Sequence, residues 1–383
     1  MKKSWLAVLL VFAIALCGCG QTADEGDDNP SSTQGAWQVT DLGLCTDTVA
    51  ANARMPWDLA VSDGKLYVGI GDYTTNSGPT SIRCYDEMTK EWSSSGTVRQ
   101  EAIARFVRLD GQLIALGTDP MDSGAADCYL LKDGTWGIYS SISGALHVFD
   151  AEMHDGSIYY GIGCENGRSA VVKQDIATGE WTDVALMKGG VSYIAALEKM
   201  ENVHGKRVYD LFSVNGKLFC VFSCAYTTGK TTMEFFELSG DAFVFRQALV
   251  NTQMEMKKPV KNQVLLNADA VYENSCYISL GGLYKTEDFV RFDKIDVPNN
   301  GCVTDLLVDG TDFYILSTVQ DGEMHQNVIY KMADGKPAEV FAFSSATAAL
   351  SFAKCADGFY VGLGGAVFAH ADNGRILKIT YSE

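Results

Sequence analysis

Proline and long apolar runs are both scarce in this chain of 383 residues. There are 7 prolines against 38 glycines, a composition that excludes a proline-rich rod and suits a chain with many tight turns. The prominent apolar run, WLAVLLVFAIAL at positions 5–16, is too short to span a bilayer comfortably. Hydrophobic residues nevertheless make up 47% of the chain, which is enough for a packed globular core.

Positive charge is also in short supply. The sequence has 30 Lys and Arg against 48 Asp and Glu, so its formal net charge is −18. A field of this sign repels phosphate backbones, and we therefore predict no nucleic-acid partner. Cationic groups or a metal ion would be attracted instead, although a large net charge is also a common means of staying soluble.

Several motifs of known chemistry are missing. No C-x-x-C pair points to structural zinc, and there is no phosphate-binding loop, H-E-x-x-H or Ser-His-Asp pattern. Beyond Cys17 and Cys19 the chain has nine cysteines, an odd number that leaves at least one without an intramolecular partner. They are Cys45, Cys84, Cys128, Cys164, Cys220, Cys224, Cys276, Cys302 and Cys355. We expect most to be small buried hydrophobes, with a bond from Cys45 to Cys302 or Cys355 left open.

The N-terminus has the pattern of a targeting signal. A basic start is followed by the apolar run and then by Leu16-Cys17-Gly18-Cys19, which resembles a bacterial lipobox. The resemblance implies that residues 1–18 are a lipoprotein signal peptide and that Cys19 is lipidated. A lipid on Cys19 would anchor the protein to a membrane of the cell envelope, facing outside the cytoplasm. The alternative is an ordinary signal peptide in which the cysteine is incidental.

Residues 19–35 and 36–383 differ sharply in composition. The first segment is acidic, rich in Ser and Gly and without large apolar residues, so it is predicted to be a flexible tether. The second is built from repeats of the stretch at 58–92, in which apolar runs alternate with tight polar turns such as Asp63-Gly64. That pattern indicates a four-stranded antiparallel meander.

The repeat recurs seven times, each time with a recognisable second strand. These strands are KLYVGIG (65–71), QLIALG (112–117), SIYYGIG (157–163), KLFCVFS (217–223), SCYISLGG (275–282), DFYILST (312–318) and FYVGLGG (359–365). Their intervals bracket the length of a β-propeller blade. We therefore predict an all-β fold in which residues 36–383 form a single seven-bladed β-propeller.

The two ends of the repeat region predict how the ring closes. The seventh repeat stops after RILKI (375–379) without a fourth strand, whereas Trp37 in AWQVTDLG aligns with Trp181, which begins a fourth strand. An N-terminal strand at 37–41 that pairs with 375–379 would complete the last blade and remove two exposed sheet edges.

Short segments resemble two propeller families. YDEMTKEW (85–92) and QDIATGEWTDVALM (174–187) are similar to kelch repeats, and LYKTEDFVRFDKI (283–295) is similar to the Asp-box hairpin of sialidase-type propellers. Arg54-Met55-Pro56 also resembles the segment in which sialidases place an arginine that binds the substrate carboxylate. Both families contain enzymes and non-enzymes, so the resemblance implies a fold more than an activity.

A candidate site is formed by residues at one register of the innermost strands. An acid lies nine residues before the second-strand aromatic residue in four blades, at Asp58, Asp150, Asp210 and Asp305, and Arg105 takes the matching place in blade 2. These positions are expected to begin the first strands and to converge at the mouth of the central channel. The carboxylates could hold calcium or a cationic ligand there. Alternatively, each aspartate accepts backbone N–H bonds in its own turn.

Two long connections flank the fourth blade. Residues 188–207 include YIAALEKM, which is predicted to form one or two helical turns, and 247–266 include a basic spot. Functional residues often lie on such loops, so we expect the binding face there. We predict that the protein is a membrane-anchored monomer that acts as a binding or scaffold module for a protein or glycan. It is predicted to need no cofactor, with a calcium ion as the one candidate. The alternative is a glycan-active hydrolase related to sialidases, in which Arg54, Arg105 and Arg207 would meet in one pocket.

Overall fold

The computed structural model of the chain describes residues 36–72, 77–121, 124–164, 170–200, 203–226, 231–250, 268–280, 282–365 and 370–382. The predicted signal peptide, Cys19 and the predicted tether lie outside this range, as does most of the second long connection, at 251–267. The fold described below is that of the compact unit Ala36–Ser382.

Tight turns divide the chain into antiparallel strands. In blades 1 to 4 the first two strands are joined by Asp-Gly or Asn-Gly, and both residues have positive φ; for Asp63 and Gly64 the values are 51° and 72°. Glycine tolerates this conformation without strain, and Asp and Asn tolerate it better than most residues. The twist of such turns matches that of paired strands, so these dipeptides produce hairpins.

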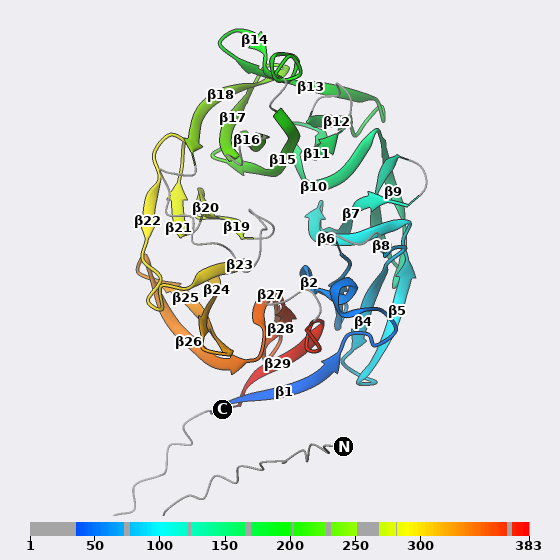
Figure 1. The fold of residues 1–383 in the computed structure, drawn as a ribbon, viewed down its shortest axis with the longest axis vertical. Coiled ribbons are helices and arrows are strands. Elements are labelled where there is room, and N and C mark those ends of the chain that lie inside the picture. The colour runs from blue at the N-terminus through cyan, green and yellow to red at the C-terminus, as the bar shows by residue number, and fades with distance from the viewer. Residues whose placement is uncertain are drawn as a thin grey trace, which may run out of the picture. The chain divides into compact units, whose positions relative to one another are not determined.

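Seven four-stranded blades result, arranged as a ring around a central axis (Figure 1). Blade 1 consists of β2 (Asp58–Ser62), β3 (Lys65–Gly69), β4 (Ser81–Asp86) and β5 (Glu91–Thr97); blade 2 of β6 (Gln100–Leu109), β7 (Gln112–Pro120), β8 (Ala125–Lys132) and β9 (Thr135–Ser143); blade 3 of β10 (Ala145–His154), β11 (Ser157–Cys164), β12 (Val171–Asp175) and β13 (Trp181–Lys188). The first strand of each blade lies nearest the axis and the last lies at the rim.

The remaining blades follow the same order. Blade 4 consists of β15 (Val203–Val214), β16 (Lys217–Tyr226), β17 (Thr231–Ser239) and β18 (Ala242–Val250); blade 5 of β19 (Asp269–Tyr272), β20 (Ser275–Ser279), β21 (Leu283–Thr286) and β22 (Asp293–Ile295); blade 6 of β23 (Cys302–Asp309), β24 (Asp312–Asp321), β25 (Met324–Ala333) and β26 (Lys336–Ser345). Blade 7 combines β27 (Ala348–Cys355), β28 (Gly358–Gly364) and β29 (Arg375–Ser382) with β1 (Ala36–Leu44) from the other end of the chain.

The predicted closure of the ring is confirmed. Strand β1 pairs antiparallel with β29, so that Trp37 faces Tyr381 and Asp41 faces Leu377. The register is two residues beyond the predicted 375–379 at the C-terminal side, although Leu44 still faces Arg375 after a bulge. The ring of Trp37 also packs against Phe341 of blade 6, with ring centroids 5.7 Å apart. The N-terminal strand therefore seals the last blade and ties it to its neighbour.

Blades 2, 3 and 4 are joined more closely than the others. Single ladder pairs connect them near the axis, and at the rim β13 runs parallel to β18 over Ala185–Met187. Between these outer strands the chain inserts β14 (Val191–Ser192) and α1 (Tyr193–Leu197), which confirms the predicted helical turn.

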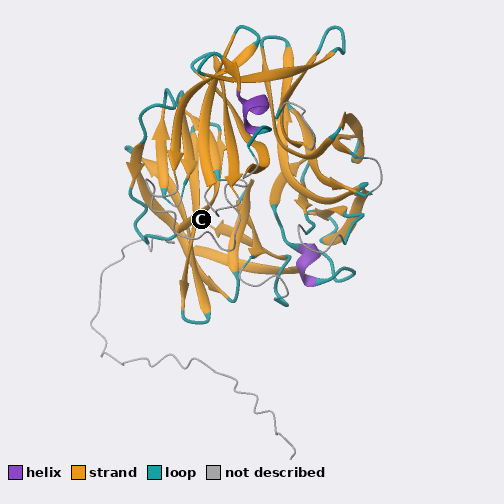
Figure 2. Cartoon of the chain, turned by 45° about the horizontal axis from the view of Figure 1, so that its top comes forward, coloured by secondary structure: helices purple, strands orange, loops and turns teal. Residues whose placement is uncertain are grey.

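The helical segments of the described chain are short (Figure 2). These are α1 and the 3₁₀ turn η1 (Ala51–Arg54). No helix among the described residues is long and apolar enough to cross a membrane.

Hydrophobic clusters fill the spaces between neighbouring blades. The cluster between blades 4 and 5 stacks Phe219 on Phe289 with ring centroids 4.4 Å apart, and Phe289 is fully buried. The six buried cysteines belong to these clusters. All eight described cysteines are free thiols, so the bond from Cys45 to Cys302 or Cys355 that the sequence left open is not formed. Cys164 is the ninth, and its side chain lies outside the described part of the structure.

Candidate functional site: the central channel

One residue from each inner strand lies beside the axis, at the same register in six blades and one position nearer the hairpin turn in blade 5. We call these seven residues the central ring: Asp58, Arg105, Asp150, Asp210, Asp269, Asp305 and Ser351. In blades 2, 3, 4, 6 and 7 a bulge in the inner strand directly precedes the ring residue, and in blades 1 and 5 the ring residue begins the strand. A bulge turns the side chain that follows it, which is how a regular strand can direct this position toward the axis.

Three ring aspartates join neighbouring blades. Each accepts one hydrogen bond from the N–H of the next residue and one from an N–H of the following blade's inner strand. For Asp58 the donors are Leu59 and Phe106, both at 2.7 Å; Asp150 has Ala151 at 2.9 Å and Leu211 at 2.7 Å; Asp305 has Leu306 at 2.8 Å and Phe352 at 2.9 Å. These carboxylates act as clamps between blades 1 and 2, 3 and 4, and 6 and 7. The alternative in which aspartates accept backbone N–H bonds therefore describes them, although one donor comes from the next blade.

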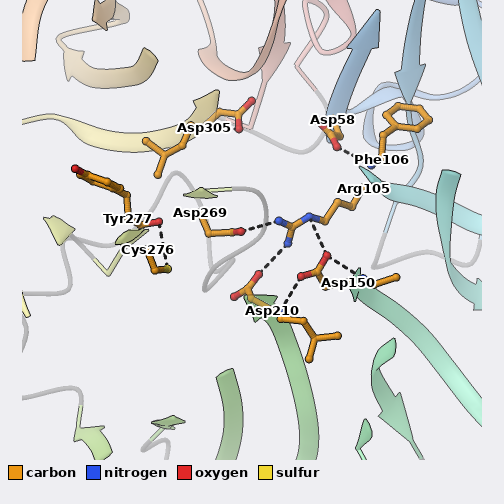
Figure 3. A network of polar contacts seen from close by, with 12 residues as sticks. Asp58, Arg105, Phe106, Asp150, Asp210, Asp269, Cys276, Tyr277 and Asp305 are labelled. Carbon is orange, nitrogen blue, oxygen red and sulfur yellow. Dashed lines mark hydrogen bonds and ion pairs between the residues drawn. The ribbon is translucent and has the colours of Figure 1, made fainter. Parts of the chain in front are cut away.

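Arg105 joins three carboxylates across the axis, of which Asp150 is also one of the clamps (Figure 3). Its Nη1 donates to Asp210 at 2.9 Å and its Nη2 to Asp269 at 2.7 Å, while Nε lies 3.6 Å from Asp150. The arginine side chain is 14% exposed and the three aspartates 7% or less. Buried charges are costly unless they are paired, and here one guanidinium compensates carboxylates from blades 3, 4 and 5.

The central ring contains five aspartates and one arginine, and four of its carboxyl groups have raised pKa values. Burial raises the pKa of Asp58 and of Asp150 from 3.8 to about 7, against the lowering effects of Arg105 and of the N–H donors. Burial also raises the pKa of Asp210 and Asp305 well above the usual range, with neighbouring aspartates adding to the rise. Some of these carboxyls therefore retain a proton near neutral pH.

The two sides of the ring differ. The residues that follow the ring line two cavities of about 320 and 300 Å³, which share Arg105 and Asp269. On the other side, the residues that precede the ring in blades 1, 2 and 7 form an apolar cluster of Met55, Trp57 and Ala102, with Leu350 packed against them. The expectation that these residues begin the inner strands is wrong for four of the five. Only Asp58 begins its strand, whereas the strands that hold Arg105, Asp150, Asp210 and Asp305 begin three to seven residues earlier.

The ring differs from a typical cation site. Calcium sites need several carboxylate oxygens that are free to face the ion. Here a guanidinium contacts three of the aspartates and backbone N–H groups occupy three, including Asp150 in both sets. Among the residues that the structure describes, no group of three or more His, Cys, Asp or Glu side chains is placed to hold a metal ion.

Comparison with known proteins supports the architecture. No protein-family model matches the sequence, and no curated protein sequence matches it. Among solved structures, a chain from a crystal structure of the mitotic checkpoint complex is 11% identical with a TM-score of 0.52, over 98% of this chain and 99% of that chain. This chain is a β-propeller.

Two other solved structures are similar at a lower level. Sqt1 from Saccharomyces cerevisiae is 12% identical over 87% of this chain and 97% of that chain, with a TM-score of 0.45. A putative 6-phosphogluconolactonase from Bacteroides fragilis is also 12% identical, over 79% of this chain and 89% of that chain, with a TM-score of 0.45.

The remaining arginines of the hydrolase alternative do not join Arg105. Arg54 donates to the backbone carbonyls of Ala371 and Asn373, each at 2.6 Å. Arg207 lies beside the rings of Phe149 and Tyr209. The three arginines therefore have separate sets of partners, and these contacts give no support to a shared carboxylate-binding pocket.

The sequence pattern did not predict that Asp269 belongs to the central ring. The spacing rule required an acid nine residues before the second-strand aromatic, which in blade 5 is Tyr277 and points to Ala268. Strand β19 has four residues where β2 has five, so the ring residue lies one position later. Ser351 was not predicted because it is neither acidic nor basic, unlike the residues that the pattern selected. Its hydroxyl donates to the carbonyl of Pro56 at 2.8 Å and so links blade 7 to the segment that precedes blade 1. Allowing a one-residue variation in hairpin length would have found Asp269.

Proposed function

We propose that this propeller is a binding or scaffold module, anchored to a membrane of the cell envelope by lipid on Cys19 and facing outside the cytoplasm. The basic start, the apolar run and the Leu-x-Gly-Cys sequence support the anchor. The resemblance of residues 85–92 and 174–187 to kelch repeats supports the binding role, because kelch propellers present loops from a rigid ring. In this proposal the protein acts as a monomer, since the ring is closed by the chain's own β1.

The observation that supports a binding role is that the polar groups of the central ring are bonded to other groups of the protein. Arg105 has a carboxylate near each guanidinium nitrogen, and the carboxylates of Asp58, Asp150 and Asp305 are bonded to backbone N–H groups. A catalytic acid or nucleophile must be free to meet a substrate atom. The polar groups of the ring instead hold the blades together, which suits a rigid frame whose surface loops bind a partner.

The anchor is tested by fractionating cells that express the full chain or its Cys19→Ser variant. We expect the wild-type protein to label with fatty acid and sediment with membranes, and the variant to be unlabelled and released. A variant that still labels and sediments would assign the anchor to another residue.

The absence of catalysis is tested with the same wild-type protein and fluorogenic sialosides and neutral glycosides. We expect no turnover above that of buffer. Turnover that disappears in Arg54→Gln but persists in an exposed control, Arg291→Gln, would replace the binding proposal with the hydrolase alternative.

A further inference from the structure

Arg207 is unusual among the arginines of this protein. It is partly buried on the inner strand β15, three residues before Asp210, and thus on the opposite side of the ring from the two cavities. Its Nη1 donates to the hydroxyl of Tyr209 at 3.3 Å, and within the described ranges no other hydrogen bond or ion pair of this guanidinium is present. The other partly buried arginines of those ranges all donate to carboxylates or backbone carbonyls; they are Arg54, Arg83, Arg105 and Arg375.

Aromatic side chains hold Arg207 in place. The guanidinium carbon lies 5.8 Å from the centre of the Phe149 ring, and Phe149 in turn packs on Tyr209 with centroids 4.6 Å apart. The opposite neighbour of Phe149 is His147, whose ring is stacked on it at 5.0 Å and whose Nε2 lies 2.9 Å from Asp119. An arginine beside an aromatic ring is restrained without losing its hydrogen-bond donors.

A glycine lets this stack approach the neighbouring strand. Gly163 is the ladder partner of Arg207 in blade 3, where β11 and β15 lie side by side (Figure 1). A Cβ at Gly163 would lie 2.6 Å from His147 Nδ1 and 3.1 Å from Phe149. The backbone at this point is therefore shaped to accept the His147–Phe149 stack beneath Arg207.

We propose that Arg207 is the anchor of a binding site for a carboxylate group, at the end of the channel where the inner strands begin. This inference rests on the proposed binding function and deepens it by naming the chemistry of the ligand. A planar guanidinium with unused donors matches a carboxylate in geometry and charge. A carboxylate fits better than a phosphate, because a phosphate carries up to about two negative charges at neutral pH and would be repelled more strongly by Asp119 on a protein of net charge −18.

The experiment compares acids with their own amides. Calorimetric titration of the full-length protein would use glucuronate against glucuronamide, as a sugar carboxylate, and N-acetylalanine against N-acetylalaninamide, as a peptide carboxylate. We expect at least one acid to bind at least about tenfold more tightly than its amide, because a charge-assisted pair is lost in the amide. The pair that shows this preference identifies the source of the carboxylate.

The variants assign the effect to Arg207. Arg207→Gln should abolish the preference for the acid, and Arg207→Lys should retain only part of it because a single ammonium cannot make the forked contact. Arg291→Gln, at an exposed position, should leave the preference unchanged. Tyr209→Phe removes only the hydroxyl that accepts from Nη1 and should weaken binding of the acid by a few-fold, which keeps the test valid if Arg207→Gln fails to fold.

Several outcomes would overturn the proposal. In one, neither pair shows tighter binding of the acid than of the amide at millimolar ligand. In another, the Arg207→Gln protein still binds the acid more tightly than the amide. Arg207-dependent binding of inorganic phosphate without any preference for the acids would assign the site to a different anion. Glycoside turnover or release from membranes would defeat the proposed function without touching this site, so the two failures are distinguishable.

Discussion

Replacing Arg105 by methionine would leave the central ring without its cation. Methionine keeps most of the length of the side chain but removes the pairs at 2.7, 2.9 and 3.6 Å to Asp269, Asp210 and Asp150. Removing one partner from a buried ionic cluster costs about 3–5 kcal/mol, because the remaining charges are left uncompensated. We therefore expect the free energy of unfolding to fall by about 3–5 kcal/mol at pH 8.

The loss should depend on pH, and its sign follows from the pKa values. Arg105 lowers the pKa of Asp58, Asp150 and Asp210, so its removal raises all three further. A carboxyl whose pKa is higher in the folded than in the unfolded protein binds more protons when folded, so the stability it contributes falls as the pH rises between the two values. For Asp58 and Asp150 that window runs from 3.8 to about 7 in the wild type and extends higher in the variant. The variant's deficit should therefore be smaller at pH 5 than at pH 8.

Urea unfolding followed by tryptophan fluorescence at pH 5 and pH 8 measures both effects. The matched control is Arg108→Met on the same strand, whose exposed side chain donates to the carbonyl of Val61 at 2.8 Å. That change should cost no more than about 1 kcal/mol at either pH. An Arg105→Met protein within about 1 kcal/mol of wild type at pH 8, or with the same deficit at both pH values, would show that the ring is not an ionic cluster held by Arg105.

Three further predictions follow from the same contacts. Asp305→Ala leaves two buried backbone N–H groups without acceptors and should lower the free energy of unfolding by about 2–4 kcal/mol; Asp305→Asn, which keeps one acceptor, should recover part of this, and equal losses would refute the clamp. Trp37→Ala should cost about 2 kcal/mol by removing the contacts that seal blade 7, whereas Val39→Ala on the same strand, at an exposed position, should be nearly neutral; an unchanged Trp37→Ala protein would mean that β1 does not stabilise the ring. Millimolar calcium and a chelator should both leave the melting temperature unchanged, because Arg105 already compensates the carboxylates; a rise with calcium that Asp150→Asn abolishes would instead assign a calcium site to the ring.

The sequence by itself determined the architecture of this protein. Dipeptides such as Asp63-Gly64 fix hairpins locally, because the conformation they need is available to few residue types. The missing fourth strand at the C-terminus and the surplus strand at Trp37 specify how the ring closes. Repetition at one register also predicts that Asp58, Arg105, Asp150, Asp210 and Asp305 converge, because the inner strands of a propeller share one axis.

Only the tertiary structure decided what these side chains do. The second N–H donor of Asp150 comes from Leu211, 61 positions away on the next blade, and Arg105 reaches Asp269 across 164 positions. No local spacing encodes such partners, because each depends on how far every blade projects toward the axis. Asp269 joins the ring through a shorter hairpin, and Arg207 lies over Phe149 because Gly163 of the neighbouring blade leaves room for the stack. The pattern of the repeats therefore brings the charged groups to one place, and the packing between blades determines which partners each of them contacts.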